Sequence, residues 1–471
     1  MKKTVDMTKG SPFKLLLTFS LPIALGFVLQ QLYSLGDSLI VSLSLGYNAV
    51  TGVNVTGSMT FMVLGFAQGI SAGFGIVLAQ YVGAKDEHNM RKTVGSAIVL
   101  TVIVTAILSV ITVLLSRPLL ALLETNEDYI GYADAYIKTI FAGLVFTTLY
   151  NLSDQIMRAM GDSRTPVFIL ILCAILNLGL NSLLFIFPSL TVAWAGWATV
   201  ISQGISAIVG FTVIFKKFEV LRLKACHFKL KLGFSIKLLA MGLPMAIQFV
   251  ITASGCMIQQ RAFNMLPNKY YAMAQGTAGK IDNIFGMVLN GCGTAMATYA
   301  GQNYGAKNYN RLREGLKAGL LVGLIYTAFS TVGAITLAQP LTHLLLPGAP
   351  AQVYAYSQQY LTVQGVCYYF LFALFLFRQA LQAVGKSSLT VIGGVVELVL
   401  RVIVSFTFAI WFGFDGACIS NPLAWLGGAV CFIILFAVVA KKFPHADYNE
   451  KINDEKDNDN IDNIEQAKQE A

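Results

Sequence analysis

The stretch QYVGAKDEHNMR, Gln80–Arg91, recurs later in the chain as QNYGAKNYNRLR, Gln302–Arg313. The glutamine, glycine, alanine, lysine and final arginine of the two stretches coincide at a separation of 222 residues. Chance similarity would not keep nearly this separation elsewhere. Three further matches keep it: SLPIAL with GLPMAI (Pro22 with Pro244), QIMRAMGDS with QALQAVGKS (Gln155–Ser163 with Gln379–Ser387), and Ala195-Gly196-Trp197 with Asp415-Gly416-Ala417. The chain therefore contains two copies of one unit, and this repeat decides the fold.

The composition places both copies in a membrane. Of the 471 residues, 56% are hydrophobic and 12% are charged, with a mean hydropathy of +0.66. Soluble domains carry about 25% charged residues, so a water-exposed surface is excluded for most of the chain. A helix needs about 20 apolar residues to cross a bilayer. Twelve such spans are expected, near residues 13–43, 52–81, 93–116, 132–157, 165–187, 193–215, 235–263, 270–301, 315–338, 353–381, 388–412 and 416–440.

A polar linker divides the spans into two sets of six. Because six is an even number, both copies have the same orientation, and paired bundles around a shared cavity are typical of transporters. The predicted fold is an all-α integral membrane protein with twelve transmembrane helices in two six-helix lobes, related by a pseudo-two-fold repeat. Its expected parts are a cytoplasmic N-terminal arm (1–12), an N-lobe (13–215), a cytoplasmic linker (216–234), a C-lobe (235–440) and a disordered, acidic cytoplasmic tail (441–471).

The distribution of charge predicts the orientation. With the N-terminus inside, the inside segments hold 27 of the 33 Lys and Arg residues, so the positive-inside rule predicts that both termini are cytoplasmic in a cell membrane. The basic excess is therefore attributed to orientation rather than to nucleic-acid binding. The first apolar run is too long for a removed signal peptide. The seven cysteines form no C-x-x-C pair and the four histidines fall at loops or span ends, so neither a disulfide framework nor a metal site is expected.

Several motifs together resemble the multidrug and toxic compound extrusion (MATE) family. They are the Leu-Pro near the start of each copy, YSLGD (Tyr33–Asp37), the two QxxGAK loops and RAMGDSRTP (Arg158–Pro166), and the resemblance runs from about residue 12 to 440. It implies two six-helix lobes around a central cleft, alternating access, and export of drugs, organic cations or metabolites in exchange for H⁺ or Na⁺. No cofactor is expected besides this ion, and the expected partners of a monomer are small-molecule substrates and membrane lipids.

Asp37 is the sharpest functional candidate, because an ionised carboxylate inside the membrane costs about 2.5 kcal/mol or more. By helical rise, Asp37, Asn181 and Thr199 each lie ~9 Å from the outer ends of three different spans. Tyr33 and Asn177 stand one turn from Asp37 and Asn181, respectively, on the same helix faces. The alternative is that Asp37 is an interfacial charge at the end of its span.

The resemblance implies a cation-coupling site at this depth. Family members with such a site use a Tyr-x-x-x-Asp, an Asn-x-x-x-Asp and a threonine, and this sequence matches at Tyr33, Asp37, Asn177 and Thr199. It departs at Asn181, where the second carboxylate is missing. One carboxylate with amide and hydroxyl oxygens suits a proton or Na⁺, so the coupling ion stays open, with H⁺ preferred.

The second copy does not repeat this chemistry. Glu397 and Arg401 stand one turn apart and can neutralise each other, which predicts a structural pair, with lining of the cleft as the alternative. The equivalent positions are Gln259 for Asp37, Glu397 for Asn177 and Arg401 for Asn181.

Four more charged residues fall within spans or near their ends. Asp154 and Arg158 have the i, i+4 spacing of a structural pair. Lys280 and Asp282 are two residues apart and face different directions, so one of them is expected to line the cleft.

Two other classes of protein were weighed. A lipid-linked precursor flippase of related fold would need a cationic cleft, and the spans offer only Arg261, Lys280 and Arg401 for one. An ATP-driven pump or membrane enzyme would need a catalytic domain or a nucleotide site. ALQAVGKS (Ala380–Ser387) resembles a P-loop, G-x-x-x-x-G-K-[ST], but it follows an apolar helix and its repeat copy has Asp in place of the lysine. The stretch is therefore interpreted as a helix-ending turn, and neither a bound nucleotide nor an enzyme is expected.

Overall fold

A computed structural model describes residues 4–122, 127–187 and 189–444 of the chain, so most of the predicted tail 441–471 and the first three residues of the arm lie outside the described residues. Every regular element in these ranges is helical. The helices are α1 (Pro12–Leu45), α2 (Tyr47–Val55), α3 (Gly57–Gly83), α4 (Glu87–Leu122), α5 (Glu127–Ala142), α6 (Leu144–Ala159), α7 (Thr165–Asn181), α8 (Leu183–Ile186), α9 (Val192–Lys217), η1 (Glu219–Leu221), η2 (Ala225–Phe228), α10 (Leu232–Asn264), α11 (Lys269–Gly305), α12 (Tyr309–Thr336), α13 (Ala338–Leu345), α14 (Ala351–Ala383), α15 (Ser387–Cys418) and α16 (Ser420–Ala440).

Each of the twelve predicted spans corresponds to a helix or to a pair of consecutive helices. Span 4 is divided into α5 and α6 at Gly143, where a Cβ would overlap the Val200 side chain of α9. Gly413, with a φ of 59°, breaks α15 near its end. Within the described residues, ten helices are long and apolar enough to cross a membrane. The α5–α6 pair misses this limit because each helix is short, and α11 misses it because it carries many polar residues.

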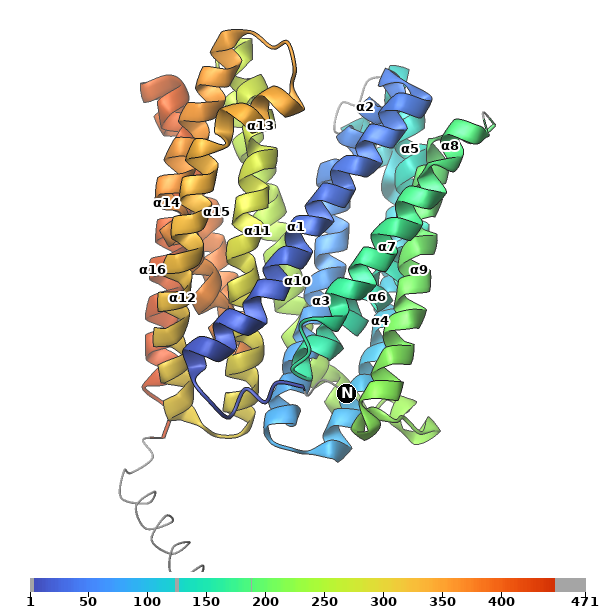
Figure 1. The fold of residues 1–471 in the computed structure, drawn as a ribbon, viewed down its shortest axis with the longest axis vertical. Helices are drawn as coiled ribbons and strands as arrows, with labels where there is room; N and C mark the ends of the chain where they lie inside the picture. The colour runs from blue at the N-terminus through green and yellow to red at the C-terminus, as the bar shows by residue number, and fades with distance from the viewer. Residues whose placement is uncertain (1–3, 123–126, 188, 445–471) are drawn as a thin grey trace, which may run out of the picture.

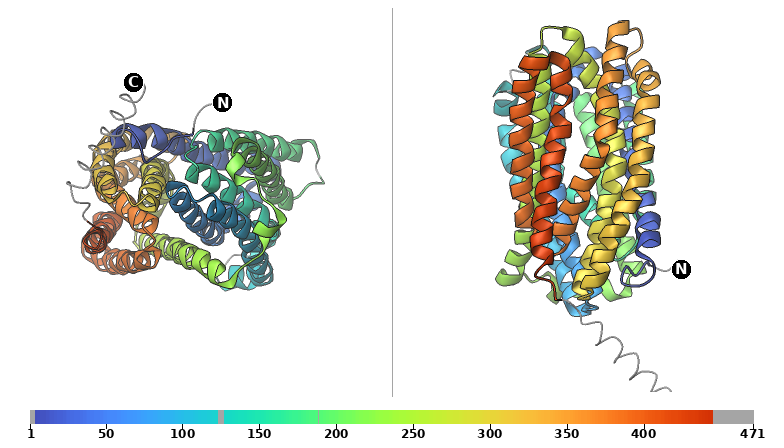
Figure 2. Two further views of the ribbon diagram at one scale, coloured as in Figure 1. Left: turned by 90° about the horizontal axis from the view of Figure 1, so that it is seen from below. Right: turned by 90° about the vertical axis from the view of Figure 1, so that its left-hand side faces the viewer.

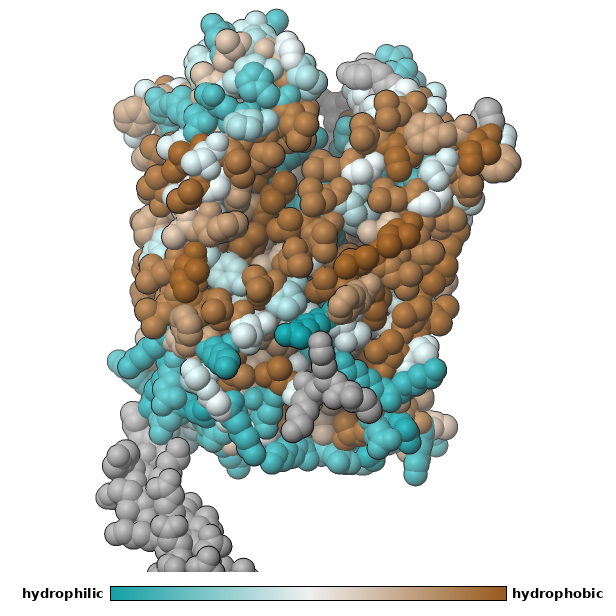
Figure 3. All heavy atoms as spheres, viewed as in Figure 1, coloured by the Kyte–Doolittle hydropathy of each residue, from teal (hydrophilic) through white to brown (hydrophobic). Residues whose placement is uncertain are grey.

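The helices form two groups that lie close together at one end and diverge at the other (Figure 1). Viewed from below, the second-half helices, coloured yellow to red, lie on one side and most first-half helices lie on the other (Figure 2). We call α1–α9 the N-lobe and α10–α16 the C-lobe. A band of hydrophobic side chains surrounds the middle of the bundle, with hydrophilic side chains at its ends (Figure 3). The described first and last residues lie at the same end, where the lobes meet.

Helix α1 belongs to both lobes by its contacts. It crosses from the foot of the C-lobe to the top of the N-lobe (Figure 1). Its first half, including Leu16, Phe19 and Ile23, is buried in the same hydrophobic core as α11 and α12. Its second half contributes Val41 to a separate core with residues of α8 and α9. Any movement of α1 is therefore felt by both lobes.

Glycines allow the two lobes to approach closely, and the close approaches come in pairs 222 residues apart. A Cβ at Gly69 of α3 would lie 2.5 Å from the backbone of Ala246 in α10. Its repeat counterpart, Gly291 of α11, would place a Cβ 2.8 Å from the backbone of Ala24 in α1. The same contact is thus made twice, once on each side of the lobe interface.

The repeated stretch that decides the fold also closes the end where the lobes meet. Gln80 Nε2 donates to the carbonyl of Ala383 in the C-lobe at 2.7 Å, and Gln302 Nε2 donates to the carbonyl of Ala159 in the N-lobe at 2.9 Å. A Cβ at Gly83 would overlap the backbone carbonyl of Gln302, and the glycine equivalent to Gly83 in the second copy meets Gln80 in the same way. We call these two reciprocal contacts the clamp.

The N-terminal arm lies across the clamp. Met7 is fully buried, and its backbone N–H donates to Gln302 Oε1 at 3.0 Å. Asn303 Nδ2 donates to the carbonyl of Met7 at 3.0 Å, and the Val5 N–H donates to the carbonyl of Gly161 at 3.0 Å. The arm thereby joins the α6–α7 turn of the N-lobe to α11 of the C-lobe.

The P-loop-like stretch is a helix-ending turn, as predicted. Helix α14 ends at Ala383, and Gly385 follows with a φ of +79° before α15 begins at Ser387. The Lys386 N–H donates back to the carbonyl of Leu381 at 3.1 Å. The repeat copy turns in the same way at Gly161, with a φ of +80°. A left-handed glycine after a helix is the usual way to satisfy its last carbonyls.

The Asp162 carboxylate links the start of α7 to the end of α9, outside the spans. Oδ1 accepts from the backbone N–H of Thr165 at 3.1 Å, and Oδ2 accepts from Lys217 Nζ at 2.6 Å. Burial acts to raise the pKa of Asp162, but the hydrogen bonds from Lys217 and Thr165 outweigh it and hold the pKa below its ordinary value of 3.8. The carboxylate therefore stabilises the fold above that value, and this stability is lost as pH falls through the lowered pKa.

Replacing Asp162 with asparagine is expected to lower the free energy of unfolding by on the order of 1–2 kcal/mol at neutral pH, because a charge-assisted hydrogen bond is lost. The deficit should shrink as the pH approaches 3. Thermal-unfolding midpoints of purified wild type and variant between pH 7 and pH 3 check this. A deficit that does not change with pH would contradict a role for the charge.

Candidate functional site

A cavity of about 840 Å³ lies between the two lobes. The surface is hollowed between them at the end where they diverge (Figure 3). Its walls come from α1, α3, α6 and α9 of the N-lobe and from α10, α11, α14, α15 and α16 of the C-lobe. Six charged residues of the described chain line it: Asp37, Arg158, Asp282, Arg378, Glu397 and Arg401. This accounts for the polarity of α11, which faces the cavity over much of its length.

Asp37 lies on the N-lobe wall and is bound by side chains from α7 and α9. Asn181 Nδ2 donates to Asp37 Oδ1. The same amide donates to Asn177 Oδ1 at 3.2 Å, and Asn177 Nδ2 donates to Thr199 Oγ1 at 3.1 Å. The Asn177 and Thr199 side chains also interact with the Asp37 carboxylate. The three helices selected by depth in the sequence therefore meet at one cluster.

The position of Asp37 differs from that of a charge at the end of a helix. Helix α1 continues to Leu45, two turns beyond Asp37, and the carboxylate faces Asn181, which is fully buried. Tyr33 lies one turn away on the same cavity wall and is close enough to interact electrostatically with Asp37. Asn181 Oδ1 is buried without a hydrogen-bond partner, so the cluster holds an unused acceptor beside its carboxylate.

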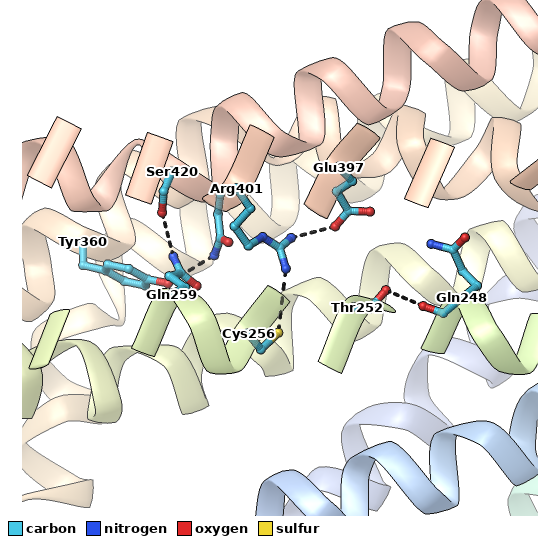
Figure 4. A network of polar contacts seen from close by, with 9 residues as sticks. Gln248, Thr252, Cys256, Gln259, Tyr360, Glu397, Arg401 and Ser420 are labelled. Carbon is cyan, nitrogen blue, oxygen red and sulfur yellow. Dashed lines mark hydrogen bonds and ion pairs between the residues drawn. The ribbon is translucent and has the colours of Figure 1, made fainter. Parts of the chain in front are cut away.

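The predicted Glu397–Arg401 pair forms, and it also lies on the cavity wall. Arg401 Nη2 donates to Glu397 Oε1 at 2.6 Å, and both side chains are buried. Figure 4 shows both side chains reaching from α15 toward α10, where Arg401 Nη1 contacts Cys256 Sγ at 3.9 Å. Gln259, the counterpart of Asp37, instead donates to Ser420 Oγ at 3.1 Å (Figure 4). The C-lobe thus has an internal ion pair where the N-lobe has the Asp37 cluster.

Replacing Glu397 with glutamine is expected to destabilise the protein by about 3–5 kcal/mol, because it leaves the Arg401 guanidinium buried without its counter-charge. The double variant Glu397→Gln/Arg401→Gln should regain part of this loss. Thermal unfolding in detergent measures both. Equal destabilisation in the single and double variants would argue against a structural pair.

One member of the pair Lys280 and Asp282 faces the cavity, as expected from their spacing. Asp282 lines it and accepts a hydrogen bond from the Tyr368 hydroxyl at 2.8 Å. Lys280 is exposed and is not among the lining residues. Arg261 is also exposed and absent from the wall. The inventory of cationic groups for a cleft was therefore wrong at two of its three positions, since only Arg401 lines the cavity.

Two lining arginines escaped that inventory. The break after span 10 was taken to begin before Arg378, but α14 continues to Ala383 and Arg378 faces the cavity. Arg158, in the last turn of α6, lines it too, and its Nη2 contacts Asp154 Oδ2 at 2.8 Å, as their spacing predicts. The missed signal was the repeat itself, because Asp154 and Arg378 occupy equivalent positions beside the matched stretches QIMRAMGDS and QALQAVGKS.

Comparison with known proteins gives one family. The MatE family model matches residues 22–183 and 244–407. The chain is 27% identical over 429 residues to "Probable multidrug resistance protein YpnP" of Bacillus subtilis, covering 90% of this chain and 94% of that protein. It is 24% identical over 428 residues to "FAD transporter" of Shewanella oneidensis, covering 89% and 94%.

Solved structures show the same fold. A structure described as "Outward-facing conformation of a multidrug resistance MATE family transporter of the MOP superfamily" superposes with a TM-score of 0.87 at 18% identity, covering 94% of this chain and 100% of that one. A Pyrococcus furiosus structure described as "Reverse polarity of binding pocket suggests different function of a MOP superfamily transporter" gives a TM-score of 0.86 at 18% identity, covering 94% and 99%.

Proposed function

Because this chain belongs to the MatE family of multidrug efflux transporters, we propose that it is a secondary antiporter that exports drugs, organic cations or related metabolites in exchange for H⁺ or Na⁺. It acts as a monomer in the cell membrane, with both termini in the cytoplasm. Export proceeds by alternating access of the cavity between the lobes. The relatives and structural neighbours are transporters rather than enzymes, and their names do not favour the flippase alternative.

The Asp37 cluster is the observation that carries ion coupling. A carboxylate at this depth needs a counter-charge, and its direct partners are neutral amide and hydroxyl groups. A proton or Na⁺ supplies the missing positive charge, and Asn181 Oδ1 is available as a further oxygen ligand. Both ions suit this set of groups, so the ion itself is settled by flux measurements.

Helix α1 provides the connection between the ion and the movement of the lobes. Pro22 removes one backbone hydrogen bond within α1, between the part packed on the C-lobe and the part that carries Asp37. When an ion neutralises Asp37, its hold on Asn181 in α7 weakens, and α1 rearranges at this point. The membrane potential adds about 2.3 kcal/mol per charge per 100 mV to this step.

The clamp supports alternating access. It closes one end of the cavity through a small number of hydrogen bonds and close backbone contacts between lobes, while the other end is hollowed. An interface of this kind separates without unfolding either lobe, because each lobe keeps its own hydrophobic core.

Transport by purified protein in liposomes tests the function. An imposed pH or Na⁺ gradient should drive uptake or release of a fluorescent organic cation, and the cation should in turn drive movement of H⁺ or Na⁺. Substrate movement that is independent of both gradients would rule out antiport with these ions. Movement that requires ATP would contradict secondary transport.

A further inference from the structure

The repeat reverses a charge on the cavity wall. In the N-lobe, Asp154 and Arg158 stand one turn apart on α6 and form an ion pair at 2.8 Å. Their equivalents on α14 are Arg378 and Gln382. The C-lobe therefore has a guanidinium in place of the carboxylate and a neutral amide in place of the guanidinium. The ion pair of the N-lobe has no counterpart here.

Arg378 is left with a positive charge that no carboxylate neutralises directly. Among the described residues, it has no ion pair within 4.0 Å, and its guanidinium lies 4.9 Å from the ring centre of Phe375. Glu397 is close enough to interact with it electrostatically, but that carboxylate is already bound by Arg401 at 2.6 Å. Two arginines and one glutamate therefore leave one net positive charge on this part of the wall.

Polar groups without partners surround this charge on the C-lobe wall. Gln248 is 4% exposed, and both its Nε2 and Oε1 atoms lack hydrogen-bond partners. Gln382 is 3% exposed, and its Oε1 is also without a partner. Both side chains line the cavity, and Figure 4 shows the Gln248 amide beside the Glu397 carboxylate.

The backbone makes room for these groups. A Cβ at Gly394 would lie 2.6 Å from both Nε2 and Oε1 of Gln248, and a Cβ at Gly255 would lie 2.6 Å from Arg401 Nη1. Buried polar atoms without partners cost about 1–3 kcal/mol each. A ligand that offers both acceptors and charge at this wall recovers that cost.

We propose that Arg378, with the amides of Gln248 and Gln382, forms a subsite for an anionic group, a carboxylate or phosphate, carried by an organic substrate. The guanidinium binds the two oxygens of such a group through parallel hydrogen bonds. The cavity then accepts zwitterionic compounds, with the anion on the C-lobe wall and the cationic part toward the acidic groups. This proposal rests on the transport function proposed above, since it assigns part of the same cavity to substrate.

Two dyes that differ in one group provide the test. Rhodamine 110 carries a free carboxylate, and rhodamine 123 is its methyl ester and only cationic. Binding to purified protein in detergent is measured by fluorescence anisotropy. Arg378→Gln is expected to weaken rhodamine 110 binding by about tenfold or more, as the loss of a charge-assisted pair implies, and to leave rhodamine 123 binding unchanged. Arg378→Lys should keep part of the preference.

Two controls complete the experiment. Arg261→Gln removes an exposed arginine that is not on the wall and should change neither affinity. Rhodamine 123 binding reports that each variant is folded. 4-Methylumbelliferyl phosphate, compared with 4-methylumbelliferone as competitor of rhodamine 110, shows whether phosphate is accepted as well as carboxylate.

The outcomes separate this proposal from the transport function. Equal loss of both dyes in Arg378→Gln, or no loss of either, would overturn the anion subsite. Binding of rhodamine 123 but not rhodamine 110 to the wild type would do the same while leaving drug transport intact. If the wild type binds neither dye, the subsite and the multidrug function are both contradicted.

Discussion

Asp37→Asn is expected to reduce gradient-driven efflux to the level of empty liposomes. The variant removes the only charge in the Asp37–Asn181–Asn177–Thr199 cluster but keeps a side chain of the same shape, so the fold is preserved while the ion loses its binding group. Without a change in charge, α1 receives no signal to rearrange. Efflux of a fluorescent organic cation under an imposed pH or Na⁺ gradient is the measurement.

The control for this prediction removes a different carboxylate. Asp134 of α5 is paired with Lys138 at 2.6 Å and does not line the cavity, so Asp134→Asn should retain efflux. Exchange of labelled for unlabelled cation without an ion gradient should persist in Asp37→Asn, because it does not need coupling. Full gradient-driven efflux by Asp37→Asn would refute the assignment of the coupling site.

Gly83→Ala and Gly305→Ala are expected to abolish transport by preventing closure of the clamp. A Cβ at either position overlaps the backbone carbonyl of the glutamine opposite, Gln302 or Gln80. A backbone group in a packed helix has little freedom to move aside. The lobes should therefore stay apart at this end, which stops the alternation.

The matched control is Gly276→Ala, a change on the same helix as Gly305 where a Cβ would have nothing within 4 Å. Transport assays and distances between spin labels on the loops that follow α3 and α11 give the readout. The labels should be farther apart in the two clamp variants than in wild type and Gly276→Ala. Transport by both clamp variants at the control rate would contradict this role of the clamp.

The twelve spans and the depth of the candidate cation site could be predicted from the sequence. A bilayer of fixed thickness requires apolar runs of fixed length, so the spans are visible without their packing. Helical rise then places Asp37, Asn181 and Thr199 at one depth, and the structure brings these three side chains together as that reading requires.

Rotation about the helix axis and the choice of neighbours were decided only by the tertiary structure. Periodicity shows that Lys280 and Asp282 face different ways, but only packing against α14, where Tyr368 meets Asp282, determines which one faces the cavity. The end of a span is equally ambiguous when it carries a charge, and Arg378 was placed in a loop for that reason.

The repeated stretch shows both sides of this division. From the sequence alone, QYVGAK and QNYGAK establish that the chain contains two copies of one unit. Their contact with each other follows only from the fold, because Gln80 and Gln302 are 222 residues apart and each binds the opposite lobe. Local sequence determines helices and their depth in the membrane, whereas contacts across the lobe interface depend on how whole helices pack, which no short stretch encodes.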